Sequence, residues 1–118
     1  MKAFVVEKVA DRVFSCAIQE VPVPECNKDE VVIKTTYSSL NYKDALSSVG
    51  NPGVTRKFPH ITGIDVAGVV HQTTSDAFAV GEKVLVTGYD LGMNTDGGHA
   101  EFVKVPAQRH GSPVFLTQ

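Results

Sequence analysis

Glycine and proline recur along this chain at short intervals, which limits the length of any regular element. Ten glycines and six prolines separate short stretches rich in β-branched and aromatic residues. Such stretches are typical of strands, whereas proline cannot donate to a central ladder and an interior glycine weakens a strand. The pattern therefore predicts a mainly β fold of about six or more strands, with one or two short helices, rather than a parallel sheet with crossover helices.

The residue pattern also places these elements along the chain. Strands are expected at residues 2–8, 12–21, 30–40, 62–72 and 83–87, and a last one over 99–105 after a turn at Gly97 and Gly98. Residues 41–48 can form a short helix with Ser39 or Asn41 as its cap. Gly63 and Gly68 would weaken their strand unless a bulge or a close backbone approach requires them. Many short strands between Gly and Pro turns favour a closed or partly open β-barrel.

Composition and charge exclude several classes of function. Hydrophobic residues make up 42% of the 118 residues and charged residues 20%, which is typical of a single soluble domain. The net charge of −2 provides no basic patch for nucleic acid. The first apolar run ends at Glu7, too early for a signal peptide, and no run approaches the length of a membrane span. The sequence thus predicts a cytoplasmic protein.

Four segments occur in an order that resembles a known family. They are "NYKDAL" at 41–46, "FPHITGIDVAGVV" at 58–70, "FAVGEKV" at 78–84 and "GGHAEFVKV" at 97–105. In this order they resemble the GroES-like catalytic domain of the medium-chain dehydrogenase/reductase superfamily, which is also alcohol dehydrogenase-like. Within it, the chain is most similar to the zinc-free acryloyl-CoA reductase and quinone oxidoreductase group. The resemblance implies a partly open GroES-like β-barrel over residues 1–106, followed by a divergent tail at 107–118.

The same resemblance argues against a metal. Zinc-dependent members carry a cysteine where this chain has Asn41, and Gly-His-Glu where it has Gly63, Ile64 and Asp65. A zinc site needs thiolate, imidazole or carboxylate ligands, and neither Asn41 nor Ile64 supplies one. We expect a zinc-independent protein.

The resemblance implies that hydride passes from NADPH to an activated C=C bond or a quinone, beside Asn41 and Tyr42. Tyr42 suits both substrate and cofactor, because its ring is apolar and its hydroxyl is polar. Asp44 is the third catalytic candidate, with the alternative that it only favours the first helical turn. Asp65 is expected to brace the fold through a hydrogen bond more than to act in chemistry. The four histidines are expected to be structural or solvated.

The glycine-rich fingerprint of a nucleotide-binding domain does not occur in these 118 residues. We therefore expect a truncated reductase domain with weak or no NADPH binding on its own, which would need a nucleotide-binding domain in trans; whether the lone domain is an enzyme stays open. The alternative is a non-catalytic oligomeric binding or assembly module that reuses the barrel. A homo-oligomer is predicted because Val114, Phe115 and Leu116 could cover bare apolar surface or pair with a neighbouring chain.

Overall fold

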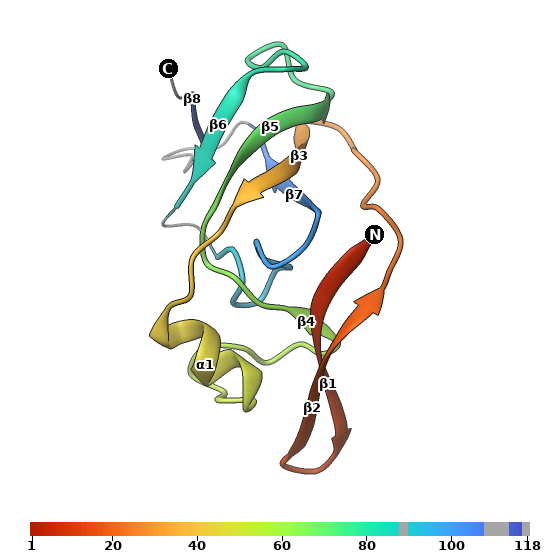
Figure 1. Cartoon of the computed structure of the whole chain (residues 1–118), viewed down its shortest axis with the longest axis vertical. Coiled ribbons are helices and arrows are strands. Elements are labelled where there is room, and N and C mark those ends of the chain that lie inside the picture. Colours follow the sequence, from red (N-terminus) through yellow and green to blue (C-terminus); the bar gives the residue numbers. More distant parts are fainter. Residues whose placement is uncertain (88–89, 108–113, 117–118) are drawn as a thin grey trace.

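The computed structural model describes residues 1–87, 90–107 and 114–116. The described residues form strands in antiparallel pairs and one helix, which confirms the prediction of a mainly β fold (Figure 1). The elements are β1 (Lys2–Ala10), β2 (Val13–Glu20), β3 (Glu30–Tyr37), α1 (Tyr42–Ser48), β4 (His60–Ile61), β5 (Val66–Thr73), β6 (Lys83–Val86), β7 (Phe102–Pro106) and β8 (Val114–Leu116).

Two sheets make up the fold. One has the order β2-β1-β4 and the other β7-β3-β5-β6-β8, so the larger sheet has two free edges and no closed barrel forms in the described part of the chain. An isolated bridge between Ala3 of β1 and Ala100 connects the smaller sheet to the segment just before β7. Figure 1 shows α1 and the β1–β2 hairpin together at one end of the molecule, with the larger sheet at the other. The expected partly open barrel is thus confirmed.

The main core lies within the larger sheet. Val31 and Ile33 of β3 are fully buried, and they join the alternate inward residues of β5, β6 and β7 in one cluster. Burying a valine or isoleucine side chain stabilises a fold by about 1.5 to 3 kcal/mol, so this cluster supplies most of the apolar driving force. A smaller cluster around Val5 and Ile61 lies under the hairpin. The end of the molecule that holds α1 depends less on apolar burial and more on hydrogen bonds.

Two strands begin later than the sequence predicts. The strand expected from Thr62 starts at Val66, and the one expected directly after Gly98 starts at Phe102. The reason is a contact between glycine backbones, which we name the glycine crossing and define as Gly63, Gly92, Gly97 and Gly98. A Cβ atom on Gly63 would lie 2.6 Å from the nitrogen of Gly98, and one on Gly97 would lie 2.3 Å from the oxygen of Gly63.

Hydrogen bonds hold the crossing together. The amides of Gly97, Gly98 and His99 donate to the carbonyls of Ile61, Gly63 and Thr62 over 2.8 to 3.0 Å. Gly97 and Gly98, expected as turn residues, are therefore positions of close backbone approach, as was expected for Gly63. Gly68 has the same role beside a bulge between β3 and β5, where its Cβ would lie 2.1 Å from the oxygen of Lys34.

The side chain of His60 binds the backbone of the glycine crossing at Gly92. Its side chain is buried, and Nε2 lies 2.9 Å from the carbonyl oxygen of Gly92. Because a carbonyl only accepts, Nε2 carries the proton. Burial lowers the pKa of His60 below its ordinary value of 6.5, and this effect outweighs the opposing influence of the Gly92 hydrogen bond and of Asp96. The folded protein thus favours the neutral ring, and His60 is structural, as expected.

The tail contributes one strand to the larger sheet. β8 pairs with β6 of the same chain, from Val114 opposite Val86 to Leu116 opposite Val84. This pairing is between backbones of one chain, and the proposed role of the tail in covering apolar surface or in association stays a prediction. His110 and the other residues at 108–113 and 117–118 lie outside the described part.

α1 has only seven residues, far fewer than a bilayer crossing requires, and no other helix of the described segments is long and apolar enough for one.

Replacing Gly63 by alanine should lower the free energy of unfolding by about 3 kcal/mol or more, because the new methyl group would meet fixed backbone at a φ of +111°. Gly81→Ala is the matched control, since Gly81 has a φ of +95° but open space around it, and it should cost only about 1 kcal/mol. Urea denaturation measures both. Equal losses would mean that the crossing does not constrain the fold.

His60→Gln should remove a pH dependence of stability. In the native chain the unfolded state binds more protons between pH 6.5 and the lowered folded pKa, so the free energy of unfolding falls as pH drops through that window. Glutamine keeps a donor to Gly92 but does not titrate. Urea midpoints at about pH 7.5 and about pH 5.5 should therefore differ less in His60→Gln than in the exposed control His71→Gln. The same drop in both variants would contradict this assignment.

Candidate functional site

A cleft of about 420 Å³ lies between the start of α1 and β1, and we name it the α1 cleft. Two of the three predicted catalytic residues, Asn41 and Asp44, line it, together with Phe4, Leu40, Thr62 and His99. Another hollow, of about 320 Å³, lies between Met1 and β7, and none of the predicted site residues lines it. The α1 cleft is therefore the candidate site.

Asp44 connects the helix to the glycine crossing. It is buried in the first turn of α1, where Oδ2 accepts the amide of Asn41 at 2.8 Å and Oδ1 accepts the amide of Gly63 at 3.1 Å. Asn41 is the N-cap, as expected, and Asp44 satisfies its amide from the third helical position. Both carboxylate oxygens of Asp44 are thus engaged by backbone, an arrangement that fixes where the helix begins.

Asp65 holds the loop before the helix. Its carboxylate accepts the amide of Ser39 at 2.9 Å, the hydroxyl of Ser39, and the side-chain amide of Asn41 at 3.4 Å. Burial raises the pKa of Asp65, but these hydrogen bonds from Ser39 and Asn41, with a smaller contribution from His99, outweigh it and leave the pKa below 3.8. Asp65 therefore stays ionised at neutral pH, and its bracing role is confirmed by these contacts.

His99 forms the side of the cleft opposite the helix. Its Nε2 lies 3.0 Å from the carbonyl oxygen of Ser39, so Nε2 carries the proton, and Nδ1 lies 2.7 Å from the hydroxyl of Thr62. The Oδ2 atom of Asp44 is 3.9 Å from Nε2. The sequence predicts only a structural or solvated role for His99. The feature of the sequence that could have indicated its place in the cleft is its position directly after Gly97 and Gly98.

Tyr42 lies differently from the other two candidates. Its side chain is 78% exposed, and it does not line the α1 cleft. Leu40 is 88% exposed and Tyr37 75%, so three large side chains at this end of the molecule have little cover. The structure thus brings Asn41 and Asp44 together inside the cleft and leaves Tyr42 on the adjacent surface.

The donor atoms around Asn41 do not suit zinc. The carboxylates nearest to it are already engaged, Asp44 by the backbone amides of Asn41 and Gly63 and Asp65 by Ser39 and Asn41. Across the described segments, no three His, Cys, Asp or Glu side chains come together as metal ligands. We therefore derive no chemistry from a metal at this cleft.

Comparison with known proteins defines the class. Residues 27–113 match the model of the alcohol dehydrogenase GroES-like domain. The chain belongs to this family, and its relatives are medium-chain oxidoreductases. YhfP of Bacillus subtilis, whose name describes a quinone oxidoreductase, is 40% identical over 105 residues, which cover 89% of this chain and 32% of YhfP. The acrylyl-CoA reductase AcuI of Ruegeria pomeroyi is 34% identical over 91 residues, covering 77% and 28%.

Solved structures of related oxidoreductases share the fold of this chain. B. subtilis YhfP with NAD bound superposes with a TM-score of 0.84 at 35% identity, covering 98% of this chain and 33% of that one. The YhdH oxidoreductase of Salmonella enterica in complex with NADP gives a TM-score of 0.81 at 35% identity, with coverage of 98% and 34%. The chain thus spans about a third of the length of the relatives it matches.

Asp44→Ala should lower the free energy of unfolding by about 2 to 4 kcal/mol, because it leaves the partly buried amide of Asn41 and the buried amide of Gly63 without acceptors. Lys43→Ala, at an exposed position of the same turn, should change it by less than about 0.5 kcal/mol. Urea denaturation monitored by circular dichroism measures the difference. A loss of similar size in both variants would show that Asp44 does not support the helix start.

Proposed function

We propose that these residues form the substrate-side catalytic domain of a zinc-independent reductase that transfers hydride from NADPH to an activated C=C bond or a quinone. The observation that carries the proposal is the α1 cleft, whose polar residues are held by Asp44, Asp65 and His99 in a fold shared with reductases. The names of AcuI and YhfP provide the two substrate classes. NADP and NAD each occur in a related structure, and NADPH is our choice from the reductase group.

The residues beside the cleft fit only one end of a nicotinamide cofactor. The exposed side chains of Leu40 and Tyr42 offer apolar and aromatic surface on which a nicotinamide ring would lie. The helix α1, by contrast, has only seven residues, and Asp44 already accepts the amide of Asn41 at its N-terminus. It therefore offers no place for a pyrophosphate. When bound, NADPH would supply the hydride. We propose that a nucleotide-binding domain supplies the remaining contacts, and that this chain alone binds NADPH weakly or not at all.

Each predicted site residue receives a distinct role. Asn41 is held by Ser39 and Asp65 and orients the substrate at the cleft wall. Tyr42 contacts cofactor and substrate from the adjacent surface, with its hydroxyl as a donor to a carbonyl. Asp44 is a positioning residue, because both of its oxygens bind backbone amides. His99 keeps the Ser39 carbonyl, and with it the loop that carries Asn41, in place.

The exposed side chains of Tyr37, Leu40 and Tyr42 also form a surface that could bind another domain or protein chain. Uncovered apolar groups of this size favour contact with another protein surface. We propose that a nucleotide-binding domain, in the same polypeptide or in trans, covers it, and that a second copy of the chain does so when that domain is absent. The alternative function, an assembly module without catalysis, would use this surface for association alone.

A chimera tests the proposed function. Residues 1–106 of this chain would replace the corresponding third of YhfP, and NADPH oxidation would be followed with a quinone and with acrylyl-CoA. Asn41→Ser, which retains a capping side chain, should lower kcat/KM about tenfold or more, because the oriented amide is lost. Val80→Ser, at an exposed position on the loop before β6, should have no effect.

Three results would contradict the proposal. One is a folded chimera that binds NADPH but reduces neither acceptor, as expected for an assembly module. Another is equal kcat/KM in the Asn41 and Val80 variants, which would mean that Asn41 is not part of the active site. Loss of activity on treatment with EDTA would contradict zinc independence.

A further inference from the structure

A second cleft, of about 390 Å³, adjoins the α1 cleft, and we name it the hairpin cleft. Phe4 and His99 line both clefts, so the two hollows meet at these side chains. The hairpin cleft extends from that junction along β1 and over Ile18 of β2, with Gly98 to Glu101 on its other side. A ligand whose reactive end lies in the α1 cleft could therefore extend past Phe4 and His99 toward the hairpin.

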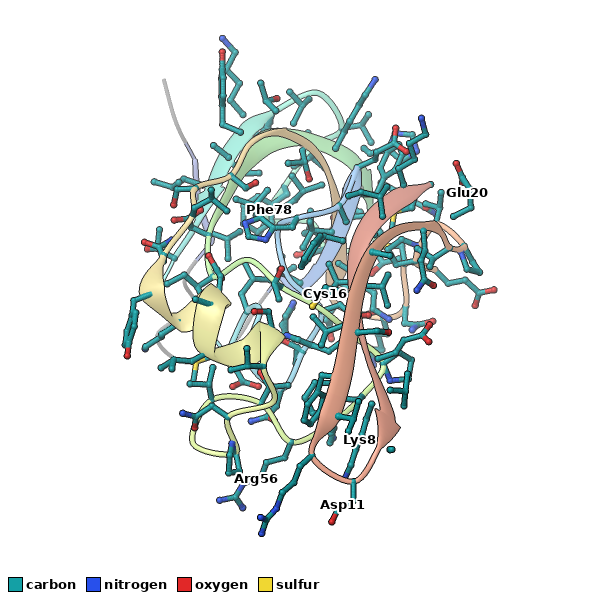
Figure 2. All side chains as sticks on the ribbon, turned by 60° about the horizontal axis from the view of Figure 1, so that its bottom comes forward. Lys8, Asp11, Cys16, Glu20, Arg56 and Phe78 are labelled. Carbon is teal, nitrogen blue, oxygen red and sulfur yellow. The ribbon has the colours of Figure 1, made fainter. Side chains whose placement is uncertain are left out.

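The hairpin presents an apolar face along this path. Phe4 pairs with Ile18 and Val6 pairs with Cys16, and paired residues share one face of a sheet. Cys16 on that face projects toward α1, where its Sγ lies 3.4 Å from the carbonyl oxygen of Ser48 (Figure 2). Ile18 is 66% exposed although it lies beside a cleft. The face with Phe4 and Ile18 thus borders both clefts and is incompletely covered.

Charge at the hairpin cleft is balanced rather than selective. Lys2 and Glu101 both line it, and the Glu101 carboxylate accepts the backbone amide of Lys2. One ammonium and one carboxylate give no net attraction for an anion or a cation. With no net charge to select an ion, the apolar side chains of Phe4 and Ile18 favour an uncharged apolar group.

We propose that the hairpin cleft is the subsite for the apolar tail of the substrate, and that Phe4 and Ile18 select conjugated carbonyl compounds with an extended tail over short ones. This inference rests on the proposed function, because it takes the α1 cleft as the site of the reacting carbonyl. It adds a chain-length preference and assigns it to the β1–β2 hairpin, which carries none of the predicted catalytic residues.

Binding of two ketones to the full chain tests the subsite without requiring catalysis. The probes are 2-pentanone and 2-nonanone, which share a head group, differ in tail length and cannot alkylate the free thiols of Cys16 and Cys26. Amide shifts in ¹⁵N-labelled protein give both the location and the Kd. We expect both ketones to shift Asn41 and His99, only 2-nonanone to shift Ile18, and 2-nonanone to bind about tenfold more tightly.

Ile18→Ser should remove most of this tenfold gain and leave the Kd of 2-pentanone unchanged. Val13→Ser is the matched control, because Val13 is an exposed apolar residue of the same strand, near the hairpin tip marked by Asp11, and lines neither cleft (Figure 2). It should keep the full gain.

The outcomes separate the two proposals. If both ketones shift Asn41 and His99 but bind equally well, or if Ile18→Ser and Val13→Ser behave alike, the subsite is wrong and the proposed function stands. If neither ketone shifts Asn41 or His99 at millimolar concentration, the α1 cleft does not bind carbonyl compounds, and both proposals fail together.

Discussion

The glycine crossing is the constraint on which the rest of this end of the molecule depends. Backbone segments around Gly63 and Gly97 approach so closely that any side chain would collide with a carbonyl or an amide. The amide of Gly63 also binds the carboxylate of Asp44, and His99 follows the crossing directly. Close packing of two backbones thus places an acidic group and an imidazole on facing sides of one cleft.

Three side chains then fix the loop that carries Asn41. Asp65 accepts from the backbone and hydroxyl of Ser39, His99 donates to the carbonyl of Ser39, and Asp44 accepts from the amide of Asn41. Each bond is modest by itself, but together they leave the loop few alternatives. Rigid support of this kind allows a site residue to keep one geometry, which is what orientation in catalysis requires.

Much of the fold could be predicted from residue pattern alone. The run Glu30 to Tyr37 is rich in β-branched residues, which favour a strand by local preference, and Val31 to Ile33 within it are buried. Strand starts near Gly63 and Gly97 could not be predicted, because a partner distant in the sequence occupies the space. The two-residue β4 had no local signal, since its pairing with Val5 and Val6 is entirely long-range. Asn41 and Asp44 were predicted as site residues, whereas the place of His99 in the cleft was not.

The sequence by itself determined the family, the strand-rich character and the helix start, because motif order, β-branched runs and a capping pair are local properties of the chain. Only the tertiary structure decided which polar groups share a cleft. It paired Asp65 with Ser39 across 26 positions and His99 with Ser39 across 60. It also turned Tyr42 outward and joined the hairpin to the cleft through Phe4. Such placements follow from backbone crossings between distant segments, and no local pattern of residues encodes them.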